Sequence, residues 1–260
     1  MNSTDDHNFA IVCVSCDKFS SLWPIFFRRF AKFWQGPDFP KYVITNFKNS
    51  NDDNWQSIKV GLDLSWSSNL LKALDKIKED NIFFVLEDAP LNNVISNNEI
   101  FDVIENFNKY KMDYLNLKST PMPSLKYQID SNLRKIPLDM PYRTSFAPAV
   151  WKKSVLCELL NVNESAWEFE IKGSVRSRSY KNFYVLSSPL MQMLHIIIKG
   201  KVDLRANRVL LETGERSEID FMNMNALDSL KLTFFEFINL LIKPFSYKIR
   251  KFFHKIKHFK

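Results

Sequence analysis

Two adjacent carboxylates, Glu87 and Asp88, directly follow the apolar run 82–86. Five bulky apolar residues in a row predict a strand that is buried on both faces. Because burying an unpaired charge is very costly, the two acids must lie where this strand leaves the sheet, and Pro90 stops the strand there. In open α/β sheets, ligands bind just beyond the carboxyl ends of the strands. The pair therefore predicts either a site for a divalent cation that holds a diphosphate, or an acidic turn that caps the next helix.

A second group of acids alternates with aromatic residues in Trp167-Glu168-Phe169-Glu170. One interpretation is an amphipathic strand, with Trp167 and Phe169 inside and both Glu side chains in water. The other is a sugar-binding surface, in which an aromatic ring packs on apolar C–H groups while a carboxylate accepts a hydrogen bond from a hydroxyl. The pattern by itself leaves both interpretations open.

The segments around these acids alternate between strand-like and helical patterns, which is typical of α/β proteins. Apolar residues recur at three- and four-residue steps across 64–77, so this segment is expected to be a helix capped by Ser67 or Ser68. We expect a Rossmann-like mixed sheet flanked by helices, with an irregular, Pro-rich stretch and a small hairpin over 119–141. The expected strands are 9–14, 41–45, 82–86 and 114–117, and the expected helices are 19–34, 64–77, 95–110 and 149–160.

The chain shows no internal repeat and no clear interdomain linker before about residue 225. We therefore expect residues 1–225 to form one domain and residues 226–260 to form a basic helical tail.

Several classes of protein are excluded by what the sequence lacks. It has five Gly residues and neither GxGxxG nor GxxxxGK[ST], which argues against a dinucleotide-binding Rossmann domain and a P-loop NTPase. Cys13 and Cys16 form a CxxC without a second Cys or His cluster, so neither a zinc nor a redox role is expected. Three thiols and a polar N-terminus predict a reducing cytoplasm and no secretory leader. No run of about 18 apolar residues is present, so no membrane span is expected.

The net charge of +7 comes from the end of the chain. Residues 231–260 contain eight Lys or Arg residues and one acid, interleaved with Phe, Leu and Ile. Pro244 is expected to divide this tail into two helices, and the second has apolar residues at helical spacing with bases around them. That pattern predicts an amphipathic helix on an anionic membrane surface. Packing on the first domain or on a second chain is the alternative, and nucleic acid is not the expected partner because large Phe side chains suit lipid better.

The order of these features resembles the GT-A family of nucleotide-sugar glycosyltransferases, especially bacterial enzymes that build surface polysaccharides such as lipopolysaccharide and capsule. The resemblance covers roughly residues 9–215. It rests on four segments: Val14-Ser15-Cys16-Asp17 at the end of the first strand, the helical segment 64–74, the acidic motif within 84–91, and Ala166-Trp167-Glu168-Phe169-Glu170. The chain departs from the family in one place, because it has Glu-Asp-Ala where the family has Asp-x-Asp.

The resemblance implies a role for each of these segments. Asp88 is expected to hold Mn²⁺ or Mg²⁺ on the donor, and Glu170, with Glu168 as second candidate, to act as the base of an inverting hexosyltransferase. The resemblance also implies which residues contact a UDP-linked donor: Ser15, Cys16, Asp17, Asn46, Trp66, Ser67, Asn69, Glu87 and Lys201.

For some of these residues a plainer role competes. Asp17 is equally explained as a turn residue, Trp66 as a core residue, and Lys201 as part of a solvated turn.

The implied acceptor is a hydroxyl of a lipid-linked surface glycan, and the implied location is cytoplasmic, on the inner face of the cell membrane. Two other functions remain open. One is a metal-dependent nucleotidyl- or phosphotransferase, and the other is a non-catalytic, membrane-bound scaffold of a polysaccharide assembly complex.

Overall fold

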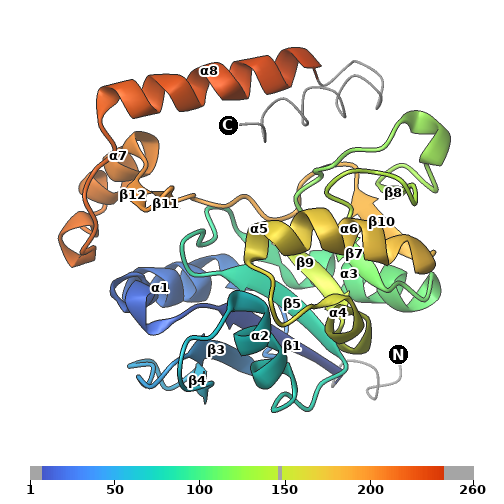
Figure 1. Ribbon diagram of the computed structural model, residues 1–260, viewed down its shortest axis with the longest axis horizontal. Coiled ribbons are helices and arrows are strands. Elements are labelled where there is room, and N and C mark those ends of the chain that lie inside the picture. Colours follow the sequence, from blue (N-terminus) through green and yellow to red (C-terminus); the bar gives the residue numbers. More distant parts are fainter. Residues whose placement is uncertain (1–7, 146–147, 243–260) are drawn as a thin grey trace. The chain divides into compact units, whose positions relative to one another are not determined.

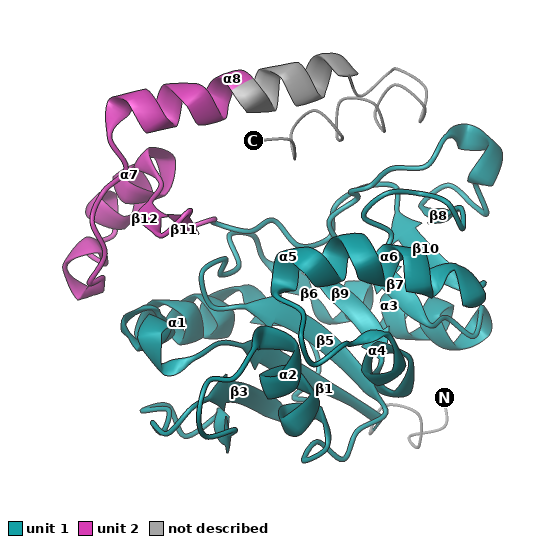
Figure 2. Ribbon diagram, in the orientation of Figure 1, with its two compact units in different colours: residues 1–194 teal, residues 195–260 magenta. Residues whose placement is uncertain are grey.

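The computed structural model describes residues 8–145 and 148–242 of the 260-residue chain. The chain divides into two compact units, Met1–Leu194 and His195–Lys260 (Figure 2). The domain boundary expected after residue 225 stays a prediction.

Eight strands form one sheet in the first unit (Figure 1). The strands on one side of the sheet are parallel to one another, and β9 lies antiparallel between β5 and β7. Because β5 and β7 are both antiparallel to β9, they run in the same direction and end at the same edge. In spatial order the strands are β4 (Gln56–Lys59), β3 (Lys41–Thr45), β1 (Phe9–Val14), β5 (Asn81–Leu86), β9 (Ala149–Lys152), β7 (Tyr114–Asn116), β10 (Phe183–Leu186) and β8 (Leu133–Lys135).

Helices cover both faces of this sheet. The odd-numbered residues of β1 belong to the core that includes α1 (Trp23–Phe33) and α3 (Asn97–Lys109). The even-numbered residues belong to the core that includes α2 (Trp66–Leu74) and α4 (Lys153–Leu159). A strand covered on both faces must be apolar throughout, which explains the uninterrupted apolar run of β1. The predicted fold class, a Rossmann-like mixed sheet flanked by helices, is confirmed.

The short elements of this unit connect the sheet to its helices. They are the 3₁₀ turns η2 (Asp17–Leu22), η3 (Leu125–Tyr127) and η5 (Ser177–Ser179), the helical turns α5 (Ala166–Glu168) and α6 (Ser174–Arg176), the π-helical turn η4 (Phe169–Gly173), and the paired strands β2 (Trp34–Gln35) and β6 (Ile95–Ser96).

The predicted strands over 9–14, 41–45 and 82–86 are confirmed as β1, β3 and β5. The prediction of one helix over 149–160 is wrong in its first part, because residues 149–152 form β9 and only then does α4 begin. A short apolar run suits a buried strand and a buried helix equally. The position between β5 and β7, where both sides of β9 are hydrogen-bonded, decides in favour of the strand.

The second unit contains β11 (Ile197–Ile198), β12 (Lys201–Val202), α7 (Leu204–Glu212), η6 (Arg216–Glu218) and α8 (Ala226–Ile242). Asp203 caps α7, because its Oδ1 accepts the backbone N–H groups of Arg205 (2.9 Å) and Ala206 (3.2 Å). Along residues 8–145 and 148–242 no helix is both long enough and apolar enough to cross a bilayer. The second tail helix expected after Pro244 lies outside the described residues.

Candidate functional site

The predicted acidic pair lies at the carboxyl edge of the sheet. Glu87 and Asp88 form a turn directly after β5, in which the N–H of Ala89 donates to the carbonyl of Leu86 (3.2 Å). Because β5 lies in the middle of the sheet, this turn lies near the middle of its carboxyl edge. Glu87 is buried, with 5% of its surface exposed, and Asp88 is half-buried.

Burial dominates the electrostatics of this pair. It raises the pKa of Glu87 well above its usual range, the Asp88 carboxylate raises it further, and a hydrogen bond with Ser15 acts in the opposite direction. Burial also raises the pKa of Asp88 to about 6. In the part of the chain that the structure describes, no Lys or Arg side chain forms an ion pair with either carboxylate. Two acids placed together without a cation favour a ligand that carries positive charge.

Other predicted residues lie close to this pair. The indole Nε1 of Trp23 donates to the Oγ of Ser15 at 2.8 Å, and Ser15 also contacts Glu87. Burial raises the pKa of the Cys16 thiol, and the carboxylates of Glu87 and Asp63 raise it further. Asp63, for which the sequence pattern gives no signal, is close enough to Cys16 for its charge to act on the thiol.

Asn69 belongs to the same group, because its Nδ2 donates to Asp63 Oδ1 at 2.6 Å. Ser15 and Cys16 therefore lie near Glu87, and Asn69 is linked to them through Asp63. We call these residues with Asp63, Glu87 and Asp88 the donor-side cluster.

Asp17 and Asn46 join the ends of β1 and β3. The N–H of Asp17 donates to Asn46 Oδ1 (3.0 Å), and the Asp17 carboxylate accepts the backbone N–H groups of Asn46 (2.9 Å), Phe47 (2.9 Å) and Lys48 (3.2 Å). Asn46 Nδ2 donates in turn to the carbonyl of Gly61 (3.0 Å). These contacts agree with the interpretation of Asp17 as a turn residue. Contacts of either side chain with a nucleotide stay a prediction.

The start of α2 is already capped. The predicted cap is wrong, because Ser65 is the N-cap and its Oγ accepts the N–H of Ser68 at 3.0 Å. The N–H of Ser67 donates to the carbonyl of Glu164 at 3.3 Å, and the Ser67 side chain is fully buried. The N–H groups of Ser67 and Ser68 therefore have partners within the protein, which weakens the case for an anion site there.

Trp66 packs into the core on the same side of the sheet. Its ring centroid lies 5.7 Å from that of Phe169 and 6.5 Å from that of Phe84. This packing favours the core role over contact with a nucleobase.

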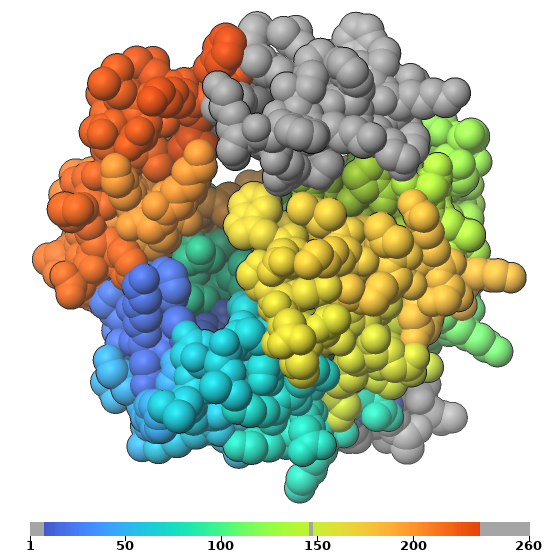
Figure 3. Space-filling model, in the orientation of Figure 1, coloured from blue at the N-terminus to red at the C-terminus, as the bar shows by residue number. Residues whose placement is uncertain are grey.

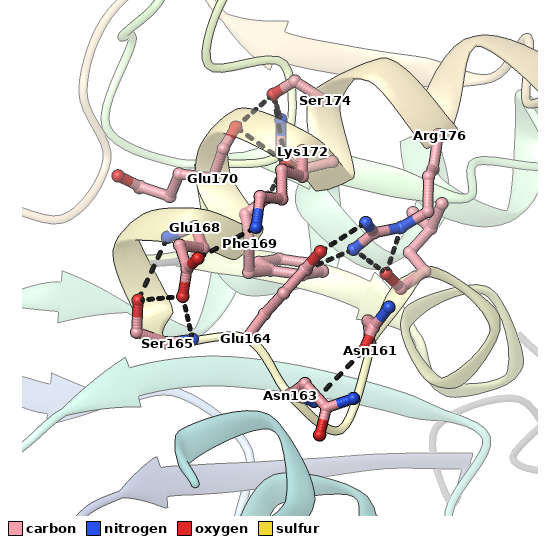
Figure 4. A network of polar contacts seen from close by, with 12 residues as sticks. Asn161, Asn163, Glu164, Ser165, Glu168, Phe169, Glu170, Lys172, Ser174 and Arg176 are labelled. Carbon is pink, nitrogen blue, oxygen red and sulfur yellow. Dashed lines mark hydrogen bonds and ion pairs between the residues drawn. The ribbon is translucent and has the colours of Figure 1, made fainter. Parts of the chain in front are cut away.

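The acidic aromatic segment is helical, so the interpretation as an amphipathic strand is wrong. Residues near 160–180, yellow in Figure 3, lie on the surface of the first unit. Ser165 and Glu168 form a capping box: Ser165 Oγ accepts the N–H of Glu168 (3.4 Å), and Glu168 Oε2 accepts the N–H of Ser165 (3.0 Å). Lys172 Nζ donates to Glu168 Oε1 at 2.8 Å (Figure 4). The bond from Lys172, followed by those from Ser165, lowers the pKa of Glu168 to about 2, which makes Glu168 a weak base.

Glu170 is the second residue of the π-helical turn η4. Figure 4 shows its side chain extending away from the contacts of Glu168. Its carbonyl accepts from Ser174 Oγ (2.5 Å) and from Thr144 Oγ1 (3.3 Å), both of them buried hydroxyls. A Cβ at Gly173 would lie 3.1 Å from the Phe169 ring and 3.2 Å from Thr144 Oγ1, so a larger residue here would require its neighbours to shift by a few tenths of an ångström. Single π-turns occur frequently at functional sites.

Lys201 belongs to the second unit, in which β11 and β12 form a hairpin. The residues that turn the chain are Lys199 (φ 53°) and Gly200 (φ 75°). Lys201 Nζ donates to Asp228 Oδ2 at 2.9 Å. The structure thus gives Lys201 a partner in its own unit, and its contact with a diphosphate stays a prediction.

Arg176 and Glu164 anchor the segment that carries Glu170. The Arg176 guanidinium donates to both carboxylate oxygens of Glu164 (2.7 and 2.6 Å) and to the carbonyl of Leu159 (2.6 Å). Glu164 is buried, with 5% of its side chain exposed.

Arg176→Met is expected to lower the free energy of unfolding by about 3 kcal/mol, because it leaves the buried Glu164 carboxylate without its partner. Urea unfolding measures this. Lys172→Met removes the exposed ion pair with Glu168 and is expected to leave stability unchanged, so equal losses in the two variants would contradict the anchoring role.

The buried residues that support this segment leave no pattern in the sequence. Arg143 is fully buried, donates to the carbonyls of Ser177 (2.6 Å) and Tyr180 (2.7 Å), and lies 4.0 Å from the centroid of the Phe183 ring. Burial lowers the pKa of Arg143 to about 10. Arg143 lies just after the irregular stretch 119–141, where hydrophobic periodicity does not indicate which residues are buried.

The acidic pair by itself is an incomplete set of metal ligands. Among the residues that the structure describes, no group of three or more His, Cys, Asp or Glu side chains is arranged to hold a metal. Mg²⁺ is commonly held by one or two carboxylates together with substrate phosphates. Glu87 and Asp88 therefore suit a cation that arrives with a diphosphate better than one held by protein ligands alone.

The sequence matches no known protein family and no curated protein. Among solved structures, TarS from S. aureus is similar with a TM-score of 0.48 and 12% identity, over 71% of this chain and 36% of TarS. TarS 1–349 in complex with UDP-GlcNAc is similar with a TM-score of 0.45 and 13% identity, over 68% of this chain and 58% of that protein. The bifunctional IspDF from Campylobacter jejuni is similar with a TM-score of 0.38 and 17% identity, over 63% of this chain and 46% of IspDF. This chain spans 60% or less of the length of each of these proteins.

Proposed function

We propose that this protein is a GT-A glycosyltransferase that moves a sugar from a UDP-linked donor to a hydroxyl of a lipid-linked surface glycan. The observation that carries the proposal is the acidic pair Glu87–Asp88 at the carboxyl end of β5, with Ser15 and Cys16 near Glu87. Ligands of open α/β sheets bind beyond this edge. A metal–diphosphate is the kind of ligand that relieves the mutual repulsion of two buried acids.

In this proposal Asp88 holds Mn²⁺ or Mg²⁺, and Glu87 adds a second carboxylate behind it. When bound, the cation offsets the negative charge that develops on the leaving diphosphate. The protein's own contribution is to hold both acids in place through burial and through Ser15, whose hydroxyl is fixed by Trp23.

Glu170 is the proposed general base, which takes the proton of the acceptor hydroxyl in an inverting reaction. Two observations favour it over Glu168. The Glu168 carboxylate is engaged by Ser165 and Lys172, whereas the Glu170 side chain extends away from those contacts (Figure 4).

The first test uses the full-length protein and a panel of nucleotide sugars with and without manganese. Thermal stabilisation by a UDP-sugar, followed by release of UDP, is the expected result. Release of pyrophosphate instead would assign nucleotidyl transfer. If calorimetry detects no binding of any nucleotide sugar, the protein is better described as a non-catalytic scaffold.

We further propose that residues 231–260 bind the anionic inner face of the cell membrane. At the start of α8, Leu227, Leu230 and Phe234 recur at helical spacing and are 70%, 66% and 61% exposed. These residues extend the apolar pattern of the basic tail towards the N-terminus. Apolar area and Lys or Arg charge act together in such membrane contacts.

Lys255→Gln combined with Lys257→Gln is expected to weaken binding to vesicles rich in anionic lipid by about 30-fold, because each base near such a surface contributes about 1 kcal/mol. Co-sedimentation measures this at low and high salt. The matched control, Lys59→Gln with Lys72→Gln, changes exposed bases of the first unit and is expected to bind normally. Equal loss in both double variants would place the membrane contact elsewhere.

A further inference from the structure

One turn of the helical segment that carries Glu170 is wider than an α-helical turn. The π-helical turn η4 (Phe169–Gly173) lies between the short α-helical turns α5 and α6. π-helical turns are rare and occur mostly as single turns within α-helices. Irregular turns of this kind have identifiable causes, among them a side chain that inserts into the hydrogen bonds of the helix. We therefore expect a residue from outside the segment to hold η4 in its wider form.

Thr144 is this residue. It is fully buried, and its Oγ1 donates to the carbonyls of Phe169 (3.4 Å) and Glu170 (3.3 Å). Its N–H donates to Ser174 Oγ (3.1 Å), and Ser174 Oγ donates in turn to the carbonyl of Glu170 (2.5 Å; Figure 4). Two buried hydroxyl groups, one from the helical segment and one from outside it, thus converge on one carbonyl.

Packing fixes the two ends of the same turn. The Phe169 ring is fully buried, and its centroid lies 5.7 Å from that of Trp66 and 6.3 Å from that of Trp151. Gly173 is buried at the other end, where a Cβ would lie 3.1 Å from the Phe169 ring. Glu170, by contrast, is half-buried. The ends of η4 are therefore held in the core, while Glu170 between them keeps access to solvent.

The buried hydrogen bonds continue beyond η4. Ser177 Oγ donates to the carbonyl of Ser174 (3.0 Å). Arg143, the neighbour of Thr144 in the chain, donates to the carbonyl (2.6 Å) and to the Oγ (2.8 Å) of Ser177. All four residues are buried. Because a buried polar group that loses its partner stays without a replacement, the conformation of the turn depends on these hydroxyl groups.

We infer that Thr144 and Ser174 are positioning residues: they keep η4 in its π-helical form and thereby set the direction of the Glu170 carboxylate. The inference rests on the proposed function, because it assumes that Glu170 is the base. Successive side chains of an α-helix differ in direction by about 100°. Because Phe169 and Gly173 are fixed in the core, a change of turn type between them must turn the side chains in between, and Glu170 is one of these.

The first experiment detects the hydrogen bonds to Glu170 without any turnover. In ¹³C,¹⁵N-labelled full-length protein, the backbone carbonyl carbon of Glu170 is expected to shift upfield in Thr144→Val, because the carbonyl loses one of the donors that polarise it. Thr144→Ser keeps the hydroxyl and should restore the resonance. Ser174→Ala removes the shorter bond and adds no bulk, so it carries the same test if Thr144→Val does not fold. An unchanged Glu170 resonance in a folded variant overturns the inference whatever the activity.

Ser177→Ala is the matched control on the same helical segment. It also removes a fully buried hydroxyl, but this hydroxyl donates to the carbonyl of Ser174 and not to that of Glu170. The Glu170 resonance is therefore expected to stay in place. An equal shift in Ser177→Ala would mean that the segment responds to the loss of any buried hydrogen bond, which overturns the specific role of Thr144 and Ser174.

The second experiment measures release of UDP from the UDP-sugar that stabilises the wild type most, with water as the acceptor. Thr144→Val is expected to lower kcat by about 10- to 10²-fold with the KM of the donor unchanged, since a displacement of about 1 Å at a reacting group can cost about 10²-fold. Thr144→Ser should restore kcat, and Ser177→Ala should leave it unchanged. Equal losses of kcat in Thr144→Val and Ser177→Ala would make the Thr144 hydroxyl merely structural and overturn its positioning role.

Glu170→Gln separates this inference from the proposed function. If Glu170→Gln releases UDP at the normal rate, the proposed base is wrong, and the inference fails with it. If Glu170→Gln is slow while Thr144→Val has a normal kcat, the base stands and the inference alone fails.

Discussion

Asp88→Asn is expected to reduce turnover by about 10³-fold or more and to remove the manganese-dependent part of UDP affinity. The substitution keeps the shape of the side chain but replaces a charged oxygen ligand with an amide. A single preorganised group that stabilises developing charge is typically worth about 10² to 10³ in kcat, and a lost metal ligand removes the cation as well. UDP release with saturating donor, and calorimetry of UDP with and without manganese, measure the two effects.

Glu87→Gln is the informative comparison. Glu87 is buried, and a Gln side chain keeps its size and shape while Asp88 remains in place as the proposed ligand of the cation. We therefore expect Glu87→Gln to fold normally and to lose less activity than Asp88→Asn. Equal and mild effects of the two changes would mean that the acidic pair does not hold the metal–diphosphate, and the proposed donor site would have to be abandoned.

Glu170→Gln should lower kcat by at least about 10²-fold with donor affinity nearly unchanged, because the amide keeps the side-chain shape but cannot accept a proton. The π-turn and its support by Thr144 and Ser174 involve the backbone carbonyl of Glu170, so they survive the substitution. Steady-state UDP release with acceptor present measures kcat, and UDP binding measured by calorimetry checks the donor site.

Glu168→Gln is the matched control on the same helical segment. Glu168 is engaged in a capping box and by Lys172, so its loss should affect this helix start and not proton transfer. An inactive Glu168→Gln beside a normal Glu170→Gln would move the base to Glu168. Full activity of both variants would remove the general base and favour a retaining mechanism.

The place of the acidic pair in the fold could be predicted from the sequence. The apolar runs of β1 and β5 are confirmed as buried strands, and two acids directly after β5 had to lie at the sheet edge, because charge is excluded from a two-sided core. These are local consequences of composition. The residues near the pair were harder to predict from the sequence. Asp63 comes near Asn69 and Cys16 only because of the way the chain connects the strands.

What the sequence by itself determined is the class of fold and the edge at which the acids lie, since both follow from which short segments can be buried. The tertiary structure alone decided that 149–152 is a strand between β5 and β7, since only its neighbours distinguish a short buried strand from a helix. It also decided the different surroundings of Glu168 and Glu170, two residues apart in one helical segment. Glu168 is engaged by Ser165 and Lys172 nearby, whereas the backbone carbonyl of Glu170 accepts a hydrogen bond from Thr144, which lies 26 residues away in the sequence. Contacts over such separations depend on how the strands pair and leave no periodic signal in the chain.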